Sequence, residues 1–315
     1  MLRFYRLGHA FFIERLHQAI RQSIPNDGAA LRALDALERF GFEYEDRIST
    51  QVAAEYVAEL ERRQNRARAV RMDAVRALLA GATVDPDAAE RALGHRLATT
   101  QLAFVCWAER ADLDLAPIAA ALAAALGSQR PLLVSDGAQA LWGWVAGTAA
   151  AAPERARLAS VLGAGGEPVH VTFGEPHDGP AGFRDSHQEA LRTRRVVELS
   201  GRHPPSATCF SEIALVDALS RDLEAARALV ATELGQLAAE GAREGEERSA
   251  LLAVLDTQGG LAAAASVLGL HRNTVLQRVR RAEERRGRPS DERLLELHTA
   301  LRLTAVLGPA VLRHR

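Results

Sequence analysis

The 315-residue chain contains only two cysteines, no lysine and no long apolar run. Cys106 and Cys209 provide neither a disulfide framework nor a spaced metal site, and both are expected to be core or bystander thiols. No stretch approaches the ~18 apolar residues that would span a bilayer. Residues 1–10 lack the apolar core and cleavage site of a signal peptide. These absences predict a cytoplasmic protein without a membrane partner.

The charge of the chain is nearly balanced, with a formal net charge of −1. Because lysine is absent while alanine, arginine, glycine and leucine abound, the composition is typical of GC-rich codon usage. Arginine abundance alone is therefore no evidence for nucleic-acid binding, and only a local basic cluster counts. The length accommodates two or three domains of ~100 to 200 residues each.

Residues 1–80 have the apolar spacing of amphipathic helices, with a break at residues 25–28. Residues 49–80 contain neither glycine nor proline and are predicted to form one long helix. Its apolar seam is rich in alanine, which leaves two packings open. The helix either pairs with a second copy as a coiled coil or packs on its own domain.

The pattern changes after residue 86 to that of an α+β domain. Strands are predicted at residues 102–107, 132–134, 140–145 and 170–173, and helices at residues 115–126, 153–162 and 183–199. Asp136-Gly137 is a hairpin signal between the second and third strands. The resulting β-α-β-β-α-β-α order predicts a sheet covered by helices.

Residues 201–206 are predicted to be a connector, everything from residue 211 onward to be helical, and residues 240–248 to be a charged, glycine-punctuated linker. The predicted fold is multidomain and mainly α. It comprises a helical N-terminal domain (1–80), an α+β domain (85–205), a helical linker (206–247) and an all-α C-terminal domain (248–315).

The C-terminal domain carries the pattern of a helix-turn-helix, with helices predicted at residues 249–257, 261–268 and 271–286. Alanines at 262–265 allow two helices to approach closely, and Gly269 allows a sharp turn. Val275 and Val279 are one turn apart and are expected to be buried. A DNA-binding motif is therefore predicted here.

The third of these helices has side chains suited to DNA. Arginine can pair with guanine, asparagine or glutamine with adenine, and a helix N-terminus attracts phosphate. Residues 271–288 contain seven arginines and two acidic residues. Arg272, Asn273, Thr274, Gln277 and Arg278 are predicted to enter the major groove, with Arg281 and Arg285 nearer phosphates. The alternative is a solvated arginine face like that of residues 62–71, but the combined motif favours DNA binding.

Residues 260–275, with the His271-Arg272-Asn273-Thr274 core, resemble the C-terminal domain of PucR-type bacterial regulators, a relative of the Fis-like helix-turn-helix. Residues 102–199 resemble the degenerate GGDEF-like domain of these regulators, and residues 5–9 and 46–49 their helical sensor-like N-terminal domain. The resemblance implies a final helix over residues 291–307. It also implies further helices ahead of residue 1, so either an N-terminally truncated first domain or a misassigned start is expected.

An enzymatic function is not predicted. A diguanylate cyclase needs carboxylates for two metal ions and glycines at its hairpin. Here the hairpin holds only Asp136-Gly137, and Glu109 and Asp112 lack an acidic partner there. The Gly-Gly-Glu run within residues 163–167 falls in a loop outside the hairpin. The spacing of His170, His177, His187 and His203 matches no metal-ligand pattern, so neither a metal nor a cofactor is expected.

The sequence thus predicts a transcription regulator that binds specific double-stranded DNA, responds to an unknown small-molecule effector and acts as a homodimer or higher homo-oligomer, since two half-sites multiply affinity. One alternative is a signalling module that binds a partner and has weak or lost DNA binding. It is favoured by Leu276 and Gln277, where the family commonly has arginine and tyrosine. A residual nucleotide-binding or cyclase-like protein is the second alternative.

Overall fold

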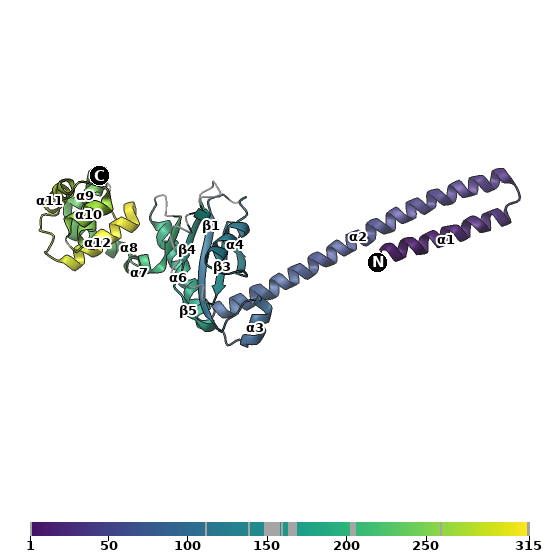
Figure 1. Ribbon diagram of the computed structural model, residues 1–315, viewed down its shortest axis with the longest axis horizontal. Helices are drawn as coiled ribbons and strands as arrows, with labels where there is room; N and C mark the ends of the chain where they lie inside the picture. The colour runs from purple at the N-terminus through teal and green to yellow at the C-terminus, as the bar shows by residue number, and fades with distance from the viewer. Residues whose placement is uncertain are drawn as a thin grey trace. The chain divides into compact units, whose positions relative to one another are not determined.

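The computed structural model describes residues 2–110, 112–137, 139–147, 158, 160–162, 169–201, 206–258 and 260–313. The chain divides into two compact units, Met1–Asp73 and Ala74–Arg315 (Figure 1). None of the described helices combines the length and the hydrophobicity needed to cross a lipid bilayer. The domain boundaries proposed from the sequence remain predictions.

The first unit consists of α1 (Leu2–Ser23) and the first part of α2 (Asp27–Leu79). Residues of both helices line one cavity, so α1 folds back along α2, as Figure 1 shows. The predicted break is confirmed at residues 24–26, whereas Gly28 already belongs to α2. Since α2 continues for 53 residues, the helix predicted for residues 49–80 is its second half.

The second unit begins with the last residues of α2, and α3 (Pro86–Leu93) follows, whose N-cap Asp85 accepts a hydrogen bond from the backbone N–H of Asp87. The sheet region then follows in this order: β1 (Thr100–Ala108), α4 (Ala116–Ala125), β2 (Leu132–Asp136), β3 (Ala140–Ala146), β4 (Val169–Phe173), β5 (His177–Asp178), α6 (Gly179–Leu199) and β6 (Ala207–Cys209). The strand order is β2-β3-β1-β4-β6, with β5 also paired to β1. Of these strand pairs, only β4–β6 is parallel, and the others are antiparallel.

Strand β1 is buried on both faces, because a helix covers each side of the sheet (Figure 1). Leu102, Phe104 and Cys106 share a core with α4, whereas Val105 and Trp107 share one with α6. Burial raises the pKa of Cys106 to about 12, which keeps this core thiol protonated. The alternation of the two faces follows from the two-residue period of a strand.

The strands and helices predicted for this region are confirmed wherever the structure describes them, with α6 beginning four residues early. In the predicted helix 153–162, residues 158 and 160–162 are described and helical. Two of the predicted segments lie outside the described residues: residues 163–167 with the Gly-Gly-Glu run, and residues 202–205 of the connector. Strands β5 and β6 were not predicted. They have two and three residues, too few to show a period.

The C-terminal part is helical throughout. It contains α7 (Phe210–Leu219), α8 (Leu223–Leu234), the 3-10 turn η1 (Gly235–Ala238), α9 (Ala242–Asp256), α10 (Leu261–Leu268), α11 (Arg272–Arg286), α12 (Leu294–Leu307) and the 3-10 turn η2 (Gly308–Ala310). One hydrophobic core joins Val216 and Val230 of α7 and α8 to Leu251, Val275 and Leu301 of α9, α11 and α12. The multidomain, mainly helical fold class is therefore confirmed.

Residues 240–248 are not the solvated linker that their charge and glycines predicted. Helix α9 begins at Ala242, and Glu244, Glu247 and Arg248 are buried. Arg248 donates hydrogen bonds to the carbonyl oxygens of Leu237 and Ala239 at 2.6 and 2.9 Å. The prediction was wrong because these charged side chains bind partners inside the fold. The partners lie far away in the sequence or in neighbouring turns.

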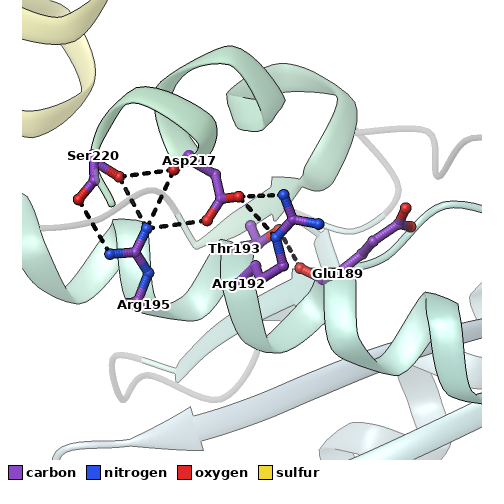
Figure 2. A network of polar contacts seen from close by, with 6 residues as sticks. All are labelled: Glu189, Arg192, Thr193, Arg195, Asp217 and Ser220. Carbon is purple, nitrogen blue, oxygen red and sulfur yellow. Dashed lines mark hydrogen bonds and ion pairs between the residues drawn. The ribbon is translucent and has the colours of Figure 1, made fainter. Parts of the chain in front are cut away.

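Helices α6 and α7 are joined by a buried carboxylate, as Figure 2 shows. Asp217 of α7 has a side chain that is 1% exposed and accepts hydrogen bonds from Arg192 Nε at 2.7 Å and Arg195 Nη2 at 3.1 Å. Arg195 Nη2 also donates to Ser220 Oγ at 3.0 Å. Burial raises the pKa of Asp217, but the hydrogen bonds and charges of the two arginines outweigh it and hold the pKa below its usual value.

Candidate nucleic-acid interface

The turn between α10 and α11 depends on a left-handed glycine. Gly269 caps α10 with a φ of 64°, and a Cβ added there would meet nothing within 4 Å. The glycine is therefore required by its backbone conformation and not by lack of space. Helix α11 then begins after the N-cap His271, whose Nδ1 accepts a hydrogen bond from the backbone N–H of Asn273 at 3.2 Å.

Helix α11 is anchored by one apolar face. Val275 and Val279 are buried, as predicted, and so is Ala282 one turn further on. Of the alanines expected to abut this helix, Ala264 and Ala265 belong to the same core, whereas residues 262 and 263 are exposed. Half of that small-residue prediction is confirmed, and Leu261 and Leu268 at the two ends of α10 pack against the same core.

The opposite face of α11 is open to solvent. Asn273, Gln277 and Arg280 are exposed and follow one another at the four- and three-residue steps of a helix face. Arg272 and Arg281 are also exposed, and Thr274 is half-buried. Arg280 was not among the residues predicted to contact DNA, although its spacing from Asn273 and Gln277 already placed it on their face.

Two of the arginines predicted to contact DNA lie instead on the flank of α11 that faces α9. Arg278 Nη2 is 2.7 Å from Glu246 Oε2. Arg285 is 3.1 Å from Glu244 Oε1 through Nη1 and 2.8 Å from Glu247 Oε2 through Nε. Both guanidinium groups thus have carboxylate partners within the domain.

Arg286 and Arg288 are likewise held within the fold. Arg286 has a buried side chain, and its Nε donates to the carbonyl oxygen of Glu233 at 3.0 Å. Arg288 approaches the buried carboxylate of the same residue. Within the described part of the chain, Arg272, Arg280 and Arg281 form no ion pair. These three residues are the free cations of α11, and we refer to them as the basic patch.

The sheet region does not gather its histidines into one site. His177 is 3.0 Å from Glu189, His170 contacts the ring of Trp107, and His187 is buried elsewhere against other aromatic rings. His203 lies outside the described residues. Among the residues that the structure describes, no three histidine, cysteine, aspartate or glutamate side chains come together to hold a metal ion.

Glu109, which follows the first strand, lies beside the hairpin, because its backbone carbonyl oxygen accepts a hydrogen bond from Gln139 Nε2 at 3.1 Å. Asp112 pairs with Arg110 at 2.6 Å, which lowers the pKa of the carboxyl below its usual value. Asp136 lies at the end of β2, opposite Ala140 in the β2–β3 register. The hairpin was predicted correctly.

Family models match three successive parts of the chain. Residues 1–71 match the RsbT co-antagonist protein rsbRD N-terminal domain, residues 79–196 a GGDEF-like domain, and residues 248–303 the PucR C-terminal helix-turn-helix domain. No curated protein matches the chain.

A similar solved structure is the regulator of polyketide synthase expression from Bifidobacterium adolescentis. It is 21% identical over 76% of this chain and 93% of its own, with a TM-score of 0.38. The three matched domains, in this order, give the chain the domain composition of the PucR-type bacterial regulators.

Proposed function

We propose that the protein is a transcription regulator that binds specific DNA by inserting α11 into the major groove. The observation that carries this proposal is the exposed face of α11, where two amide side chains, Asn273 and Gln277, lie beside the basic patch. Amide side chains and arginine are the groups that read base edges, and arginine also binds phosphates. The helix-turn-helix match of residues 248–303 supports the same function.

In this proposal Arg272, Asn273, Thr274 and Gln277 contact base edges at the start of α11, and Arg280 and Arg281 contact the backbone. The protein acts in the cytoplasm as a homodimer or higher homo-oligomer, because two half-sites raise the affinity of a small domain. A small-molecule effector acts through the domains that precede residue 248. No catalytic activity forms part of the proposal.

The first test is binding of the full chain to a random-sequence duplex library, with the retained duplexes measured again across a salt series. We expect a subset of sequences to be enriched. We also expect the logarithm of the binding constant to fall with the logarithm of salt concentration by about 0.9 for each phosphate neutralised. Binding that ignores sequence at every salt concentration would contradict the proposal.

The second test replaces two base-contacting side chains together, as R272A/N273A. The affinity for an enriched duplex should fall at least about 30-fold, because each lost bidentate contact costs roughly 1 kcal/mol or more. The melting temperature should not change, since both side chains are exposed. Arg221→Ala, an exposed arginine between α7 and α8, is the matched control and should bind as the wild type does.

A partner-binding module is the second candidate function, and the surface of the first unit favours it. Phe11, Phe42 and Tyr56 are large apolar side chains that are exposed there. Exposed apolar surface of this kind marks interaction sites. If the DNA tests fail, stable capture of a protein partner through the first unit becomes the leading function.

A further inference from the structure

Helix α9 carries two buried carboxylates beneath the recognition helix. The side chains of Glu244 and Glu247 are only 4% and 5% exposed. A carboxylate that is buried without a partner is strongly destabilising, so a cation must lie close to each of them. Arg285 of α11 approaches both, at 3.1 Å and 2.8 Å.

The two contacts use different nitrogens of one guanidinium group. Nη1 faces Glu244 and Nε faces Glu247, so a single side chain links two positions of α9 that are three residues apart. The planar, forked shape of arginine permits this two-sided contact. The two ion pairs join the C-terminal end of α11 to the first two turns of α9.

The guanidinium group of Arg285 is already engaged within the domain. Carboxylates approach it on two sides, at 3.1 and 2.8 Å, so a phosphate would have to compete with them. Arg278 lies two helical turns earlier on the same flank and is matched by Glu246 at 2.7 Å. Arg281, by contrast, is exposed and belongs to the basic patch.

We propose that Arg285 is a positioning residue: it sets the recognition helix on α9 by pairing with Glu244 and Glu247, and it does not bind a DNA phosphate. Arg278 and Glu246 support the same alignment at the middle of the helix, where the carboxylate is exposed rather than buried. The proposal rests on the proposed function of α11. It gives Arg285 a role different from the phosphate contact that the sequence alone suggested.

The first measurement is thermal unfolding of the full chain. Arg285→Met should lower the melting temperature of the second unit by about 5–10 °C, because the two buried carboxylates lose the cation that they share. E244Q/E247Q/R285M removes all three charges and should recover most of that loss. Arg281→Met, the matched control on the exposed face, should change the melting temperature by no more than about 2 °C.

The second measurement is the salt dependence of binding to a duplex enriched by the wild-type chain. Arg281→Met should reduce the slope by about one phosphate, whereas E244Q/E247Q/R285M should keep the wild-type slope. A slope that falls by about one in the triple variant, together with an unchanged melting temperature in Arg285→Met, would overturn the proposal. Arg285 would then be a phosphate contact.

A third variant separates positioning from a purely structural role. Arg285→Lys keeps the charge but loses the forked contact with two carboxylates. At a temperature well below melting, we expect affinity for the enriched duplex to fall about 3- to 10-fold, while affinity for a random duplex stays unchanged. Equal affinities of Arg285→Lys and wild type for both duplexes would overturn the positioning role.

The failure of this proposal can be told apart from failure of the proposed function. A wild-type chain that binds no DNA at any salt concentration would overturn the function assigned to α11. The melting temperatures of the variants need no DNA. They would still support or overturn the coupling of Arg285 to the two carboxylates of α9.

Discussion

At the residue scale, His187 is a titratable group held inside the GGDEF-like region. Its side chain is 2% exposed and lies between Trp142 and Trp144, with ring centroids at 4.5 and 5.0 Å. Burial lowers the pKa of His187 to about 4 from an ordinary value of 6.5. The ring is therefore neutral at physiological pH and acts as an aromatic core residue.

This pKa predicts a loss of stability in mild acid. Between pH 6.5 and pH 4 the unfolded chain binds the proton that the folded chain excludes, so stability falls as the pH decreases through this window. From pH 7 to pH 5 the contribution of His187 should fall by about 2 kcal/mol. His187→Phe keeps a ring of similar shape and should remove that part of the pH dependence.

Urea unfolding followed by tryptophan fluorescence measures this effect, because Trp142 and Trp144 contact His187 directly. His177→Gln is the control, since this histidine is more exposed and pairs with Glu189. It should retain the acid-sensitive component due to His187. Equal pH dependence in wild type and His187→Phe would contradict the assignment.

The residues of α11 show which features of the proposed interface are encoded locally in the sequence. The composition of α11 and its buried valines were predictable, because their spacing is local. The separation of Arg278 and Arg285 from Arg280 was not, because the partners of the first two lie more than thirty residues away on α9. Residues that face a distant carboxylate look the same in sequence as residues that face solvent.

At the element scale, the local signals predicted the right structures. Asp136-Gly137 marked the β2–β3 hairpin and Gly269 marked the α10–α11 turn. Strand β6 was missed because its three residues are ordered by parallel pairing with β4, a contact between distant segments. The start of α9 was missed because its charges resembled those of a solvated linker, while its buried pairs with α11 depend on tertiary structure.

The α10–α11 turn gives a prediction about two glycines that differ only in conformation. Gly269→Ala should destabilise the domain by about 1 kcal/mol, because a side chain is disfavoured at a φ of 64°. Gly245 lies inside α9, and its added Cβ would meet only Arg248 Nη2, at 3.8 Å. Gly245→Ala should therefore stabilise by roughly 0.5–1 kcal/mol through helix propensity.

Chemical denaturation of the two variants provides this comparison. The two substitutions are chemically identical. If their changes in unfolding free energy have opposite signs, backbone conformation decides the outcome. Destabilisation by both would mean that crowding around Gly245 is greater than the 3.8 Å distance indicates. Gly269→Asn should lose less than Gly269→Ala, since asparagine tolerates the left-handed region.

At the scale of the whole second unit, the contacts of α7 join the sheet region to the C-terminal helices. Val196 of α6 belongs to the hydrophobic core of α7–α12. The backbone N–H of Ser211 donates to Glu175 Oε1 at 2.7 Å, just after β4. Together with the Asp217 network of Figure 2, these contacts make α7 a shared element of both regions.

Asp217→Asn tests this coupling. Loss of the buried charge leaves Arg192 and Arg195 without their carboxylate, and we expect a destabilisation of about 3 kcal/mol. The sheet region and the C-terminal helices should then unfold in separate steps, seen by hydrogen exchange as earlier opening of α7 and α8 than of β1. Asp185→Asn, which removes a more exposed pair with Arg184, should cost less than about 1 kcal/mol.

The pH dependence of the same variant gives an independent criterion. The pKa of Asp217 is lowered in the folded state. Its ionised carboxylate therefore stabilises the fold fully above the unfolded-state pKa of about 3.9, and this stabilisation is lost as the pH falls through the folded-state pKa. The difference in unfolding free energy between wild type and Asp217→Asn should therefore be constant from pH 5 to pH 8 and should shrink in stronger acid. A constant difference throughout would show that the variant acts by altered packing, and that the two arginines do not couple the regions through charge.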